Sequence, residues 1–200
     1  MPSLAHLPLI LASSSRYRVE LLSRLRLPFS AISPDIDESP LLNETPEATA
    51  MRLAQAKALA IATGNPGTLL IGSDQVAELH GMPLGKPGNH ANAVRQLSAM
   101  SAQRVLFHTA LCLHNAVTGK SQVENVRTMV TLRTLTDAEI ERYLMLDQPY
   151  DCAGSAKVES LGITLAECID STDPTALIGL PLIALTRMLR AEGVTLMDTR

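Results

Sequence analysis

The first forty residues combine continuous apolar runs with a helical repeat of apolar positions. Residues 7–12 are almost entirely apolar, which is typical of a short, fully buried strand. Apolar residues then recur every three or four positions and predict a helix over residues 16–27. Residues 29–33 have the pattern of a second strand, and the acidic, proline-broken stretch 33–40 has the pattern of a loop.

The middle of the chain repeats this order of helix and strand. Thr45 is suited to cap a helix that has Pro46 at its first position and continues to about Thr63. The apolar strand 68–72 leads directly into Ser73-Asp74-Gln75. Residues 76–84 resemble a hairpin that turns at His80-Gly81.

The second half of the chain predicts two long strands between helices. The predicted elements are a helix over 89–100, strands over 105–115 and 122–134, a helix to Leu146 that begins with the capping box Thr136–Glu139, a loop over 150–160, a strand over 162–169 and a helix over 181–190. Helices and strands in this order predict one α/β domain with a mixed sheet over residues 1–200.

Composition narrows the class of protein. The formal net charge is −3 without a long basic run, so the broad positive surface of a nucleic-acid binder is missing, while a small anionic ligand remains compatible with a few cations. Three cysteines without Cys-x-x-Cys or Cys/His spacing argue against a zinc site and favour reduced thiols. The apolar run 7–12 is too short to cross a membrane and has no basic segment before it, so we expect a cytoplasmic protein.

The serine-rich turn between the first strand and helix is the first candidate for chemistry. Its sequence is Ser13-Ser14-Ser15-Arg16-Tyr17-Arg18. Free backbone N–H groups and the dipole at a helix start attract an anion, serine hydroxyls add donors, and an arginine binds phosphate oxygens in a fork. The alternative is that these serines only cap the helix.

Two further turns carry charges that suit a phosphate ligand. Asp74 follows an apolar strand, where it can bind a metal or take a proton from water. Lys86 lies between Gly85 and Pro87, so its ammonium projects from a rigid turn as a point charge. The spacing is not that of a Walker motif. Each turn alone is more typical of a turn with solvated charges than of a binding site. Glu38 in the acidic loop and Lys57 in the second helix can join the same site, although Lys57 alone has the pattern of a surface lysine.

Together these segments resemble the Maf family of nucleoside triphosphate pyrophosphatases. The Ser-x-Ser-x-x-Arg turn, Asp37-Glu38, Lys57, Ser73-Asp74-Gln75 and Gly85-Lys86-Pro87 occur in that family's order and at compatible spacings, and the resemblance extends to Gly179-Leu180-Pro181-Leu182. One departure is Arg16, where the family usually has proline. The resemblance implies a Maf/ITPase-like fold, with an elongated mixed sheet flanked by helices and two lobes around one nucleotide-binding cleft. A homodimer is an expectation at the level of the family.

The resemblance also implies cleavage between the α- and β-phosphates, with release of a nucleoside monophosphate and pyrophosphate. Such a reaction needs cations for the triphosphate, a divalent ion and a carboxylate that activates water. We expect Ser13, Ser15, Arg18, Lys57 and Lys86 to bind phosphate, Asp74 to act as the base, and Glu38 with Asp74 to hold the metal. Carboxylate and phosphate oxygens suit Mg²⁺, with Mn²⁺ as the alternative.

Three positions bear on the choice of base. In this family the base varies with residues matching Tyr17, Gln75 and Glu159, and the late loop 151–162 resembles the branch that acts on 7-methyl-GTP. N7-methylation gives guanine a positive charge, which an aromatic face such as Tyr17 attracts. A carboxylate such as Glu159 accepts from the two donors on the guanine edge. The alternative is that Tyr17 packs on its helix and Glu159 is solvated.

Three functions therefore remain open. The leading prediction is a pyrophosphatase that acts on 7-methyl-GTP and removes modified nucleotides before they enter RNA. The second keeps the reaction but takes dTTP, UTP or an inosine-type triphosphate as substrate. The third is a nucleotide-binding regulator of cell division, which has no need of a catalytic Asp74.

Overall fold

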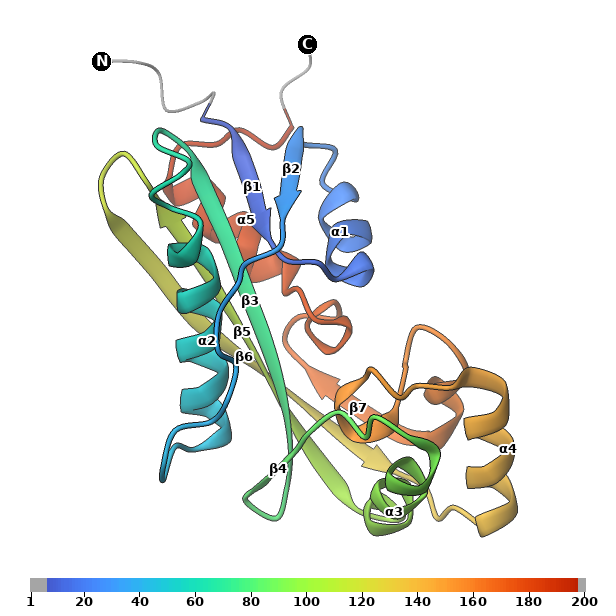
Figure 1. Ribbon diagram of the computed structural model, residues 1–200. Helices are drawn as coiled ribbons and strands as arrows, with labels where there is room; N and C mark the ends of the chain where they lie inside the picture. The colour runs from blue at the N-terminus through green and yellow to red at the C-terminus, as the bar shows by residue number, and fades with distance from the viewer. Residues whose placement is uncertain (1–6, 198–200) are drawn as a thin grey trace.

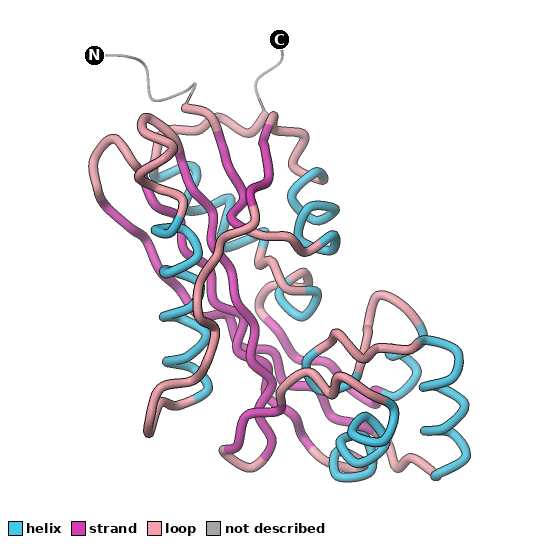
Figure 2. Tube along the Cα trace, viewed as in Figure 1, coloured by secondary structure: helices cyan, strands magenta, loops and turns pink. Residues whose placement is uncertain are grey.

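A single mixed sheet runs the length of the molecule and carries helices on both faces (Figures 1 and 2). The structure is a computed structural model that describes residues 7–197 of the 200. The strands lie in the order β2-β1-β3-β5-β6-β7, with β4 paired to β3. Strand β1 is parallel to β2 and β3, whereas β3, β5, β6 and β7 pair in antiparallel fashion. This confirms the predicted α/β class and its mixed, elongated sheet.

Three strands give the sheet its length. Their bounds are β3 Leu69–Leu79, β5 Arg104–Asn115 and β6 Lys120–Leu132, while the shorter strands are β1 Leu9–Ala12, β2 Phe29–Ile32, β4 Met82–Leu84 and β7 Ala166–Ser171. The turn between β3 and β4 has positive φ at both His80 (52°) and Gly81 (80°). A two-residue turn of this kind follows the twist of the strands, so the predicted hairpin is confirmed.

The helices cover three separate parts of the sheet. They are α1 Arg16–Ser23, α2 Pro46–Ala60, α3 His90–Met100, α4 Asp137–Asp147 and α5 Leu182–Ala191. Helices α1 and α5 pack on one face at the end that holds β1, α2 packs on the opposite face, and α3 and α4 cover the far end (Figure 1). None of the helices in residues 7–197 has the length and apolar character needed to span a lipid bilayer.

The packing of α2 on β3 requires a very short distance between helix and strand. A Cβ at Gly72 would lie 2.0 Å from the carbonyl oxygen of Ala54. Only glycine permits this approach. The small residues Ala54 and Ala58 line the same contact and are fully buried. This close packing brings the next helix position that faces the sheet, Lys57, against β3.

Several predicted elements differ from the structure at their ends, among them helix α1 and strand β7. Helix α1 ends at Ser23 rather than Leu27, because its last turns bond to residues three positions earlier and Arg26 takes a positive φ of 54° ahead of Pro28. The strand predicted over 162–169 begins only at Ala166. Its first part is a 3₁₀ turn, because Gly162 packs against the backbone of Lys157, where a Cβ would lie 2.4 Å from the carbonyl oxygen.

Candidate active site

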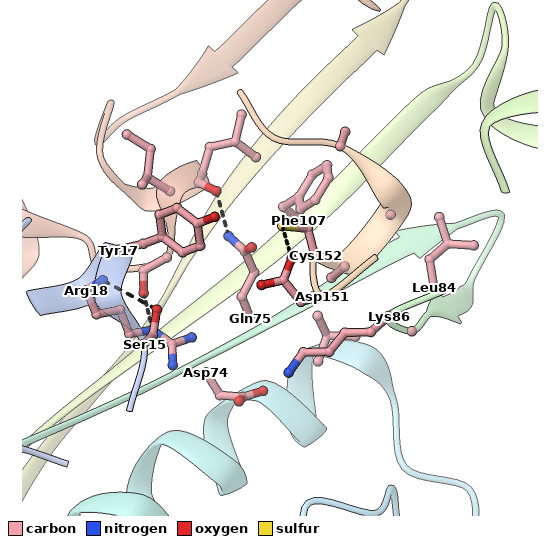
Figure 3. A pocket seen from close by; sticks show the side chains of 18 of the residues that line it. Ser15, Tyr17, Arg18, Asp74, Gln75, Leu84, Lys86, Phe107, Asp151 and Cys152 are labelled. Atoms are coloured by element: carbon pink, nitrogen blue, oxygen red, sulfur yellow. Dashed lines mark hydrogen bonds between the residues drawn. The ribbon is translucent and has the colours of Figure 1, made fainter. Parts of the chain in front are cut away.

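A cleft of about 930 Å³ opens beside an unpaired edge of β3 (Figure 3). Strand β1 pairs with β3 only as far as Gly72, and β4 begins to pair with it at Ala77. Residues 73–76 of β3 therefore lack a strand on that side. The prediction that Asp74 lies just beyond the end of a strand is wrong, since β3 continues to Leu79. The carboxylate nevertheless reaches the cleft because the neighbouring strand β1 stops.

Adjacent residues of β3 serve opposite sides of the sheet. Asp74 points towards α2, where its Oδ1 accepts a hydrogen bond of 2.6 Å from Nζ of Lys57. Gln75 points towards the segment before α5, where its amide nitrogen lies 2.9 Å from Thr109 Oγ1 and 3.1 Å from the carbonyl oxygens of Ala176 and Leu177. The alternation of side chains along a strand produces this division. The cleft thus has a charged side at Asp74 and an uncharged side at Gln75.

The charged side is built around one buried lysine. Lys57 is only 6% exposed, and its Nζ lies 2.6 Å from Asp74 Oδ1 and 2.9 Å from Glu38 Oε1. Burial opposes the ionisation of Glu38, but the hydrogen bond from Lys57 and the charges of Lys57, Lys86 and Arg18 prevail and lower the pKa of that carboxyl. Lys57 thereby keeps two acidic groups together at the mouth of the cleft.

The serine turn lies at the start of α1 as predicted. Ser15 caps the helix, with its Oγ accepting from the backbone N–H of Arg18 at 3.5 Å, and Ser13 Oγ accepts from the N–H of Ser15 at 3.1 Å. These contacts agree with the capping alternative, and both serines also line the cleft. A capped helix start still attracts an anion to its remaining N–H groups.

Arg18 is aimed into the cleft by a carbonyl group. Its Nε donates to the carbonyl oxygen of Gly179 at 2.8 Å. Burial lowers the pKa of Arg18, while the charges of Asp74 and Glu38 act in the opposite direction. A guanidinium remains charged at any physiological pH, so Arg18 supplies a fixed positive charge. Gly179 has a φ of 112°, and a Cβ there would lie 3.5 Å from Arg18 Nε.

Lys86 lies on the opposite rim, in the loop after β4. Its side chain is exposed and forms no ion pair with any residue in the range 7–197. In Figure 3 its ammonium extends towards the carboxylate of Asp74. The structure therefore brings Ser13, Ser15, Arg18, Glu38, Lys57, Asp74 and Lys86 to one cleft. These residues include three cations and two carboxylates, so the positive charges outnumber the negative ones and favour an anionic ligand.

The other side of the cleft is apolar and contains the residues predicted to read a base. Tyr17 and Gln75 lie within it, and Glu159 is exposed at its rim. Arg16, noted above only as a departure from the family pattern, stacks on Tyr17 with its guanidinium carbon 4.8 Å from the ring centroid. Its Nη2 also donates to the Tyr17 hydroxyl at 2.8 Å. The ring therefore already has a positive charge against it.

The two carboxylates fit a divalent ion only together with a ligand. No cluster of three or more His, Cys, Asp and Glu side chains suited to a metal occurs in the part of the chain that the structure describes. Mg²⁺ characteristically binds one or two carboxylates and completes its shell with water and substrate phosphates. Glu38 and Asp74, which share Lys57, fit that pattern.

Sequence reasoning missed three contributors to the cleft. They are Phe107 of β5, Gly154 of the loop over 151–159 and the carbonyl group of Gly179. Phe107 occupies a core-facing position in a strand whose residues are nearly all buried, so periodicity marks it as core. The one signal in the sequence that could have drawn attention to Phe107 is the scarcity of aromatic residues, because the chain has only two phenylalanines and three tyrosines.

The geometry defines a mixed α/β protein with a cleft that is lined by charged groups on one side and by apolar groups on the other. Comparison with known proteins is consistent with that class. The family model described as "Maf-like protein" matches residues 8–192. The chain therefore belongs to the Maf family.

Two relatives illustrate how similar the chain is to other members. It is 60% identical to the 7-methyl-GTP pyrophosphatase of Burkholderia thailandensis over 95% of this chain and 90% of that protein. It is also 60% identical to the 7-methyl-GTP pyrophosphatase of Cupriavidus metallidurans over 92% of this chain and 93% of that protein. Among solved structures, the Ham1 protein of Coxiella burnetii covers 64% of this chain and 73% of its own at 19% identity and a TM-score of 0.45.

Proposed function

We propose that this protein is a nucleoside triphosphate pyrophosphatase that hydrolyses 7-methyl-GTP to 7-methyl-GMP and pyrophosphate. The observation that carries the proposal is the likeness to relatives of that name, 57–60% identical over more than nine-tenths of the chain. The cleft supports it, since its size and its separation into charged and apolar sides suit a nucleotide.

The charged side accounts for binding of the triphosphate. Arg18 and Lys86 approach the cleft from opposite rims, and the residues at the start of α1 line the same space. A triphosphate between them exchanges hydration for charged hydrogen bonds. Arg18 contributes a planar fork that its bond to Gly179 orients, whereas Lys86 contributes a movable point charge.

Asp74 is our candidate for the base that activates water. Its Oδ1 accepts a hydrogen bond from Lys57, which restrains the rotation of the carboxylate beside the proposed phosphate site. A water molecule that gives its proton to Asp74 attacks the α-phosphorus, and pyrophosphate leaves with the electron pair of the bridging oxygen. Positioned cations stabilise the charge that grows on the leaving group.

A divalent ion, Mg²⁺ in our proposal, would be held by Asp74 and Glu38 together with phosphate oxygens, where it would neutralise negative charge. Lys57 bridges the same two carboxylates. In the absence of a metal ion, Lys57 holds Glu38 and Asp74 close together in spite of the repulsion between their charges. The lowered pKa of Glu38 keeps that carboxyl ionised and available at neutral pH.

The base end supports a guanine. The amide nitrogen of Gln75 is occupied by three oxygens of the protein, which leaves its Oε1 as the group presented to a ligand. Glu159 adds an acceptor at the rim. Two acceptors complement the N1–H and amino donors of guanine, and thymine and uracil lack that pair of donors. Tyr17, Gln75 and Glu159 are thus proposed to take part in selecting the base.

A panel of triphosphates tests the proposed function. The rate of pyrophosphate release with Mg²⁺ is measured for 7-methyl-GTP, GTP, dTTP, UTP and ITP, and the nucleotide product is identified by chromatography. We expect the highest kcat/KM with 7-methyl-GTP and 7-methyl-GMP as the product. A higher kcat/KM with dTTP or UTP would contradict the assignment, and release of 7-methyl-GDP with phosphate would contradict the position of cleavage.

A further inference from the structure

Two segments that are far apart in the sequence meet at one end of the cleft. The turn that carries Lys86 and the loop over 151–159, which ends at Glu159, both line the cleft. Figure 1 shows the chain between β4 and α3 passing beside that loop, and the backbone N–H of Gly88 donates to the carbonyl oxygen of Tyr150 at 3.0 Å. Gln96 of α3 makes a second connection between the two segments, although it does not itself line the cleft.

The Lys86 turn is held by α3 on both sides of the lysine. The Nε2 atom of Gln96 donates to the carbonyl oxygen of Gly85 at 3.0 Å, and the Nδ2 atom of Asn92 donates to that of Pro87 at 2.8 Å. Asn92 and Gln96 are four residues apart, so their side chains lie on the same face of the helix. The backbone is therefore fixed just before and just after Lys86, while the lysine side chain itself is exposed and can extend to a ligand.

The other end of the same amide holds the loop over 151–159. The Oε1 atom of Gln96 accepts a hydrogen bond of 2.5 Å from the hydroxyl of Ser155. Ser155 is fully buried and has a positive φ of 56°, directly after Gly154 with a φ of 70°. A residue other than glycine stays in this conformation only where its surroundings hold it. The bond to Gln96 is thus part of what fixes the path of the loop that leads to Glu159.

The chemistry of its two partners determines how the Gln96 amide is oriented. A backbone carbonyl only accepts hydrogen bonds, so the nitrogen of the amide must face Gly85. The amide oxygen is then left for Ser155, whose hydroxyl can donate. One side chain therefore uses its donor on the Lys86 turn and its acceptor on the loop, and this sets the distance between the two segments.

We propose that Gln96 is a positioning residue that holds Lys86 and the loop ending at Glu159 in one arrangement, and so couples phosphate binding to selection of the base. The inference rests on the proposed function, because it takes Lys86 as a phosphate ligand and Glu159 as an acceptor for guanine. Gln96 touches neither end of the nucleotide in this account. Its two hydrogen bonds place the two groups that do.

Gln96→Leu removes both hydrogen bonds while keeping a side chain of similar size at a half-buried position. The kcat/KM is measured with Mg²⁺ for 7-methyl-GTP and for UTP, which lacks the donor pair of guanine. We expect kcat/KM to fall about fivefold with UTP, because the Lys86 turn loses a bond to α3, and the ratio of 7-methyl-GTP to UTP to fall about fivefold as well. The ratio is insensitive to any fraction of unfolded enzyme, because both substrates meet the same sample. An unchanged ratio together with an unchanged kcat/KM for UTP would overturn the proposal.

Double variants separate the two connections that Gln96 makes. Ser155→Ala removes only the bond to the loop, so we expect it to lower the ratio and to leave kcat/KM for UTP unchanged. In the Ser155→Ala background Gln96→Leu should lower the ratio no further, and in the Lys86→Met background it should no longer lower kcat/KM for UTP. A loss by the same factor in every background is what a general structural effect of Gln96→Leu would produce, and it would overturn the proposal.

Gln122→Leu is the matched control. Gln122 on β6 is also a half-buried glutamine that joins two elements, since its Nε2 donates to Glu192 Oε1 at 2.7 Å and lies 3.4 Å from the carbonyl oxygen of Met188. Neither partner lines the cleft. We expect kcat/KM for both substrates to stay at the wild-type value. The same losses in Gln122→Leu as in Gln96→Leu would contradict a specific role for Gln96.

The two proposals fail in distinguishable ways. If the wild-type protein prefers UTP to 7-methyl-GTP, the proposed function fails, and this is seen before any variant is made. If the wild-type protein prefers 7-methyl-GTP and Gln96→Leu behaves like the Gln122→Leu control, only the inference about Gln96 fails.

Discussion

Replacement of Lys57 by methionine tests how the charged side of the cleft is held together. Lys57 is buried and contacts Asp74 at 2.6 Å and Glu38 at 2.9 Å. Methionine fills a similar space but removes the ammonium, so two carboxylates remain close without their shared cation. Removal of one partner from a buried ion pair costs about 3–5 kcal/mol. Because the Glu38 side chain is 53% exposed and Asp74 borders the cleft, we expect a smaller loss of about 2–3 kcal/mol.

Urea unfolding of the protein without nucleotide or metal measures this loss. The double variant Lys57→Met/Asp74→Asn removes the unpaired charge as well, so we expect it to recover about 1–2 kcal/mol relative to the sum of the single variants. Lys86→Met is the matched control, because Lys86 is an exposed lysine of the same cleft without an ion pair to any described residue, and its effect should stay within about 0.5 kcal/mol. Losses that simply add in the double variant, or a Lys57→Met protein as stable as the control, would refute this account of the buried pair.

Three further predictions concern stability and reactivity. Gly72→Ala should destabilise the fold by about 3 kcal/mol or more in urea unfolding, because its Cβ would lie 2.0 Å from a carbonyl oxygen of α2. Hydrogen bonds from Arg52 hold the pKa of Glu44 at about 2, so the stabilisation they provide is present above about pH 4.5 and is lost as the pH falls towards 2. The Tm difference between wild type and Glu44→Gln should therefore be smaller at pH 2 than at pH 6. Burial raises the pKa of the Cys152 thiol to about 12, so iodoacetamide at pH 8 should modify exposed Cys168 well before Cys152, as read by mass spectrometry, and equal rates would contradict this burial.

The sheet and most helices could be predicted from the sequence because local signals agree with tertiary packing. Thr136 and Glu139 form the predicted capping box in the structure. Strands β5 and β6 appear close to their predicted bounds, since their apolar pattern matches their burial. The 3₁₀ turn before β7 could not be predicted, because it depends on the packing of Gly162 against the backbone of Lys157, which the pattern of apolar residues does not encode.

The arrangement of the cleft depends on the relative lengths of neighbouring strands. Patterns of apolar residues end the first strand near Ala12 and predict a strand over 68–72 and a hairpin over 76–84, but they do not show that β3 runs without a break through Asp74 between them. That continuation sends Asp74 and Gln75 to opposite faces of the sheet, so it decides which residues lie together. The stacking of Arg16 on Tyr17 likewise depends on side-chain conformations that spacing does not determine.

Asp74→Asn tests the central claim most directly. Asparagine keeps the size of the side chain but cannot take a proton from water, so binding and hydrolysis should separate. Binding of 7-methyl-GTP with Mg²⁺ is measured by titration calorimetry, and pyrophosphate release is measured on the same protein. We predict a Kd within about tenfold of the wild-type KM and a loss of roughly 10²–10⁴ in kcat. Pyrophosphate release at the wild-type rate would contradict the role of Asp74 and the mechanism built on it.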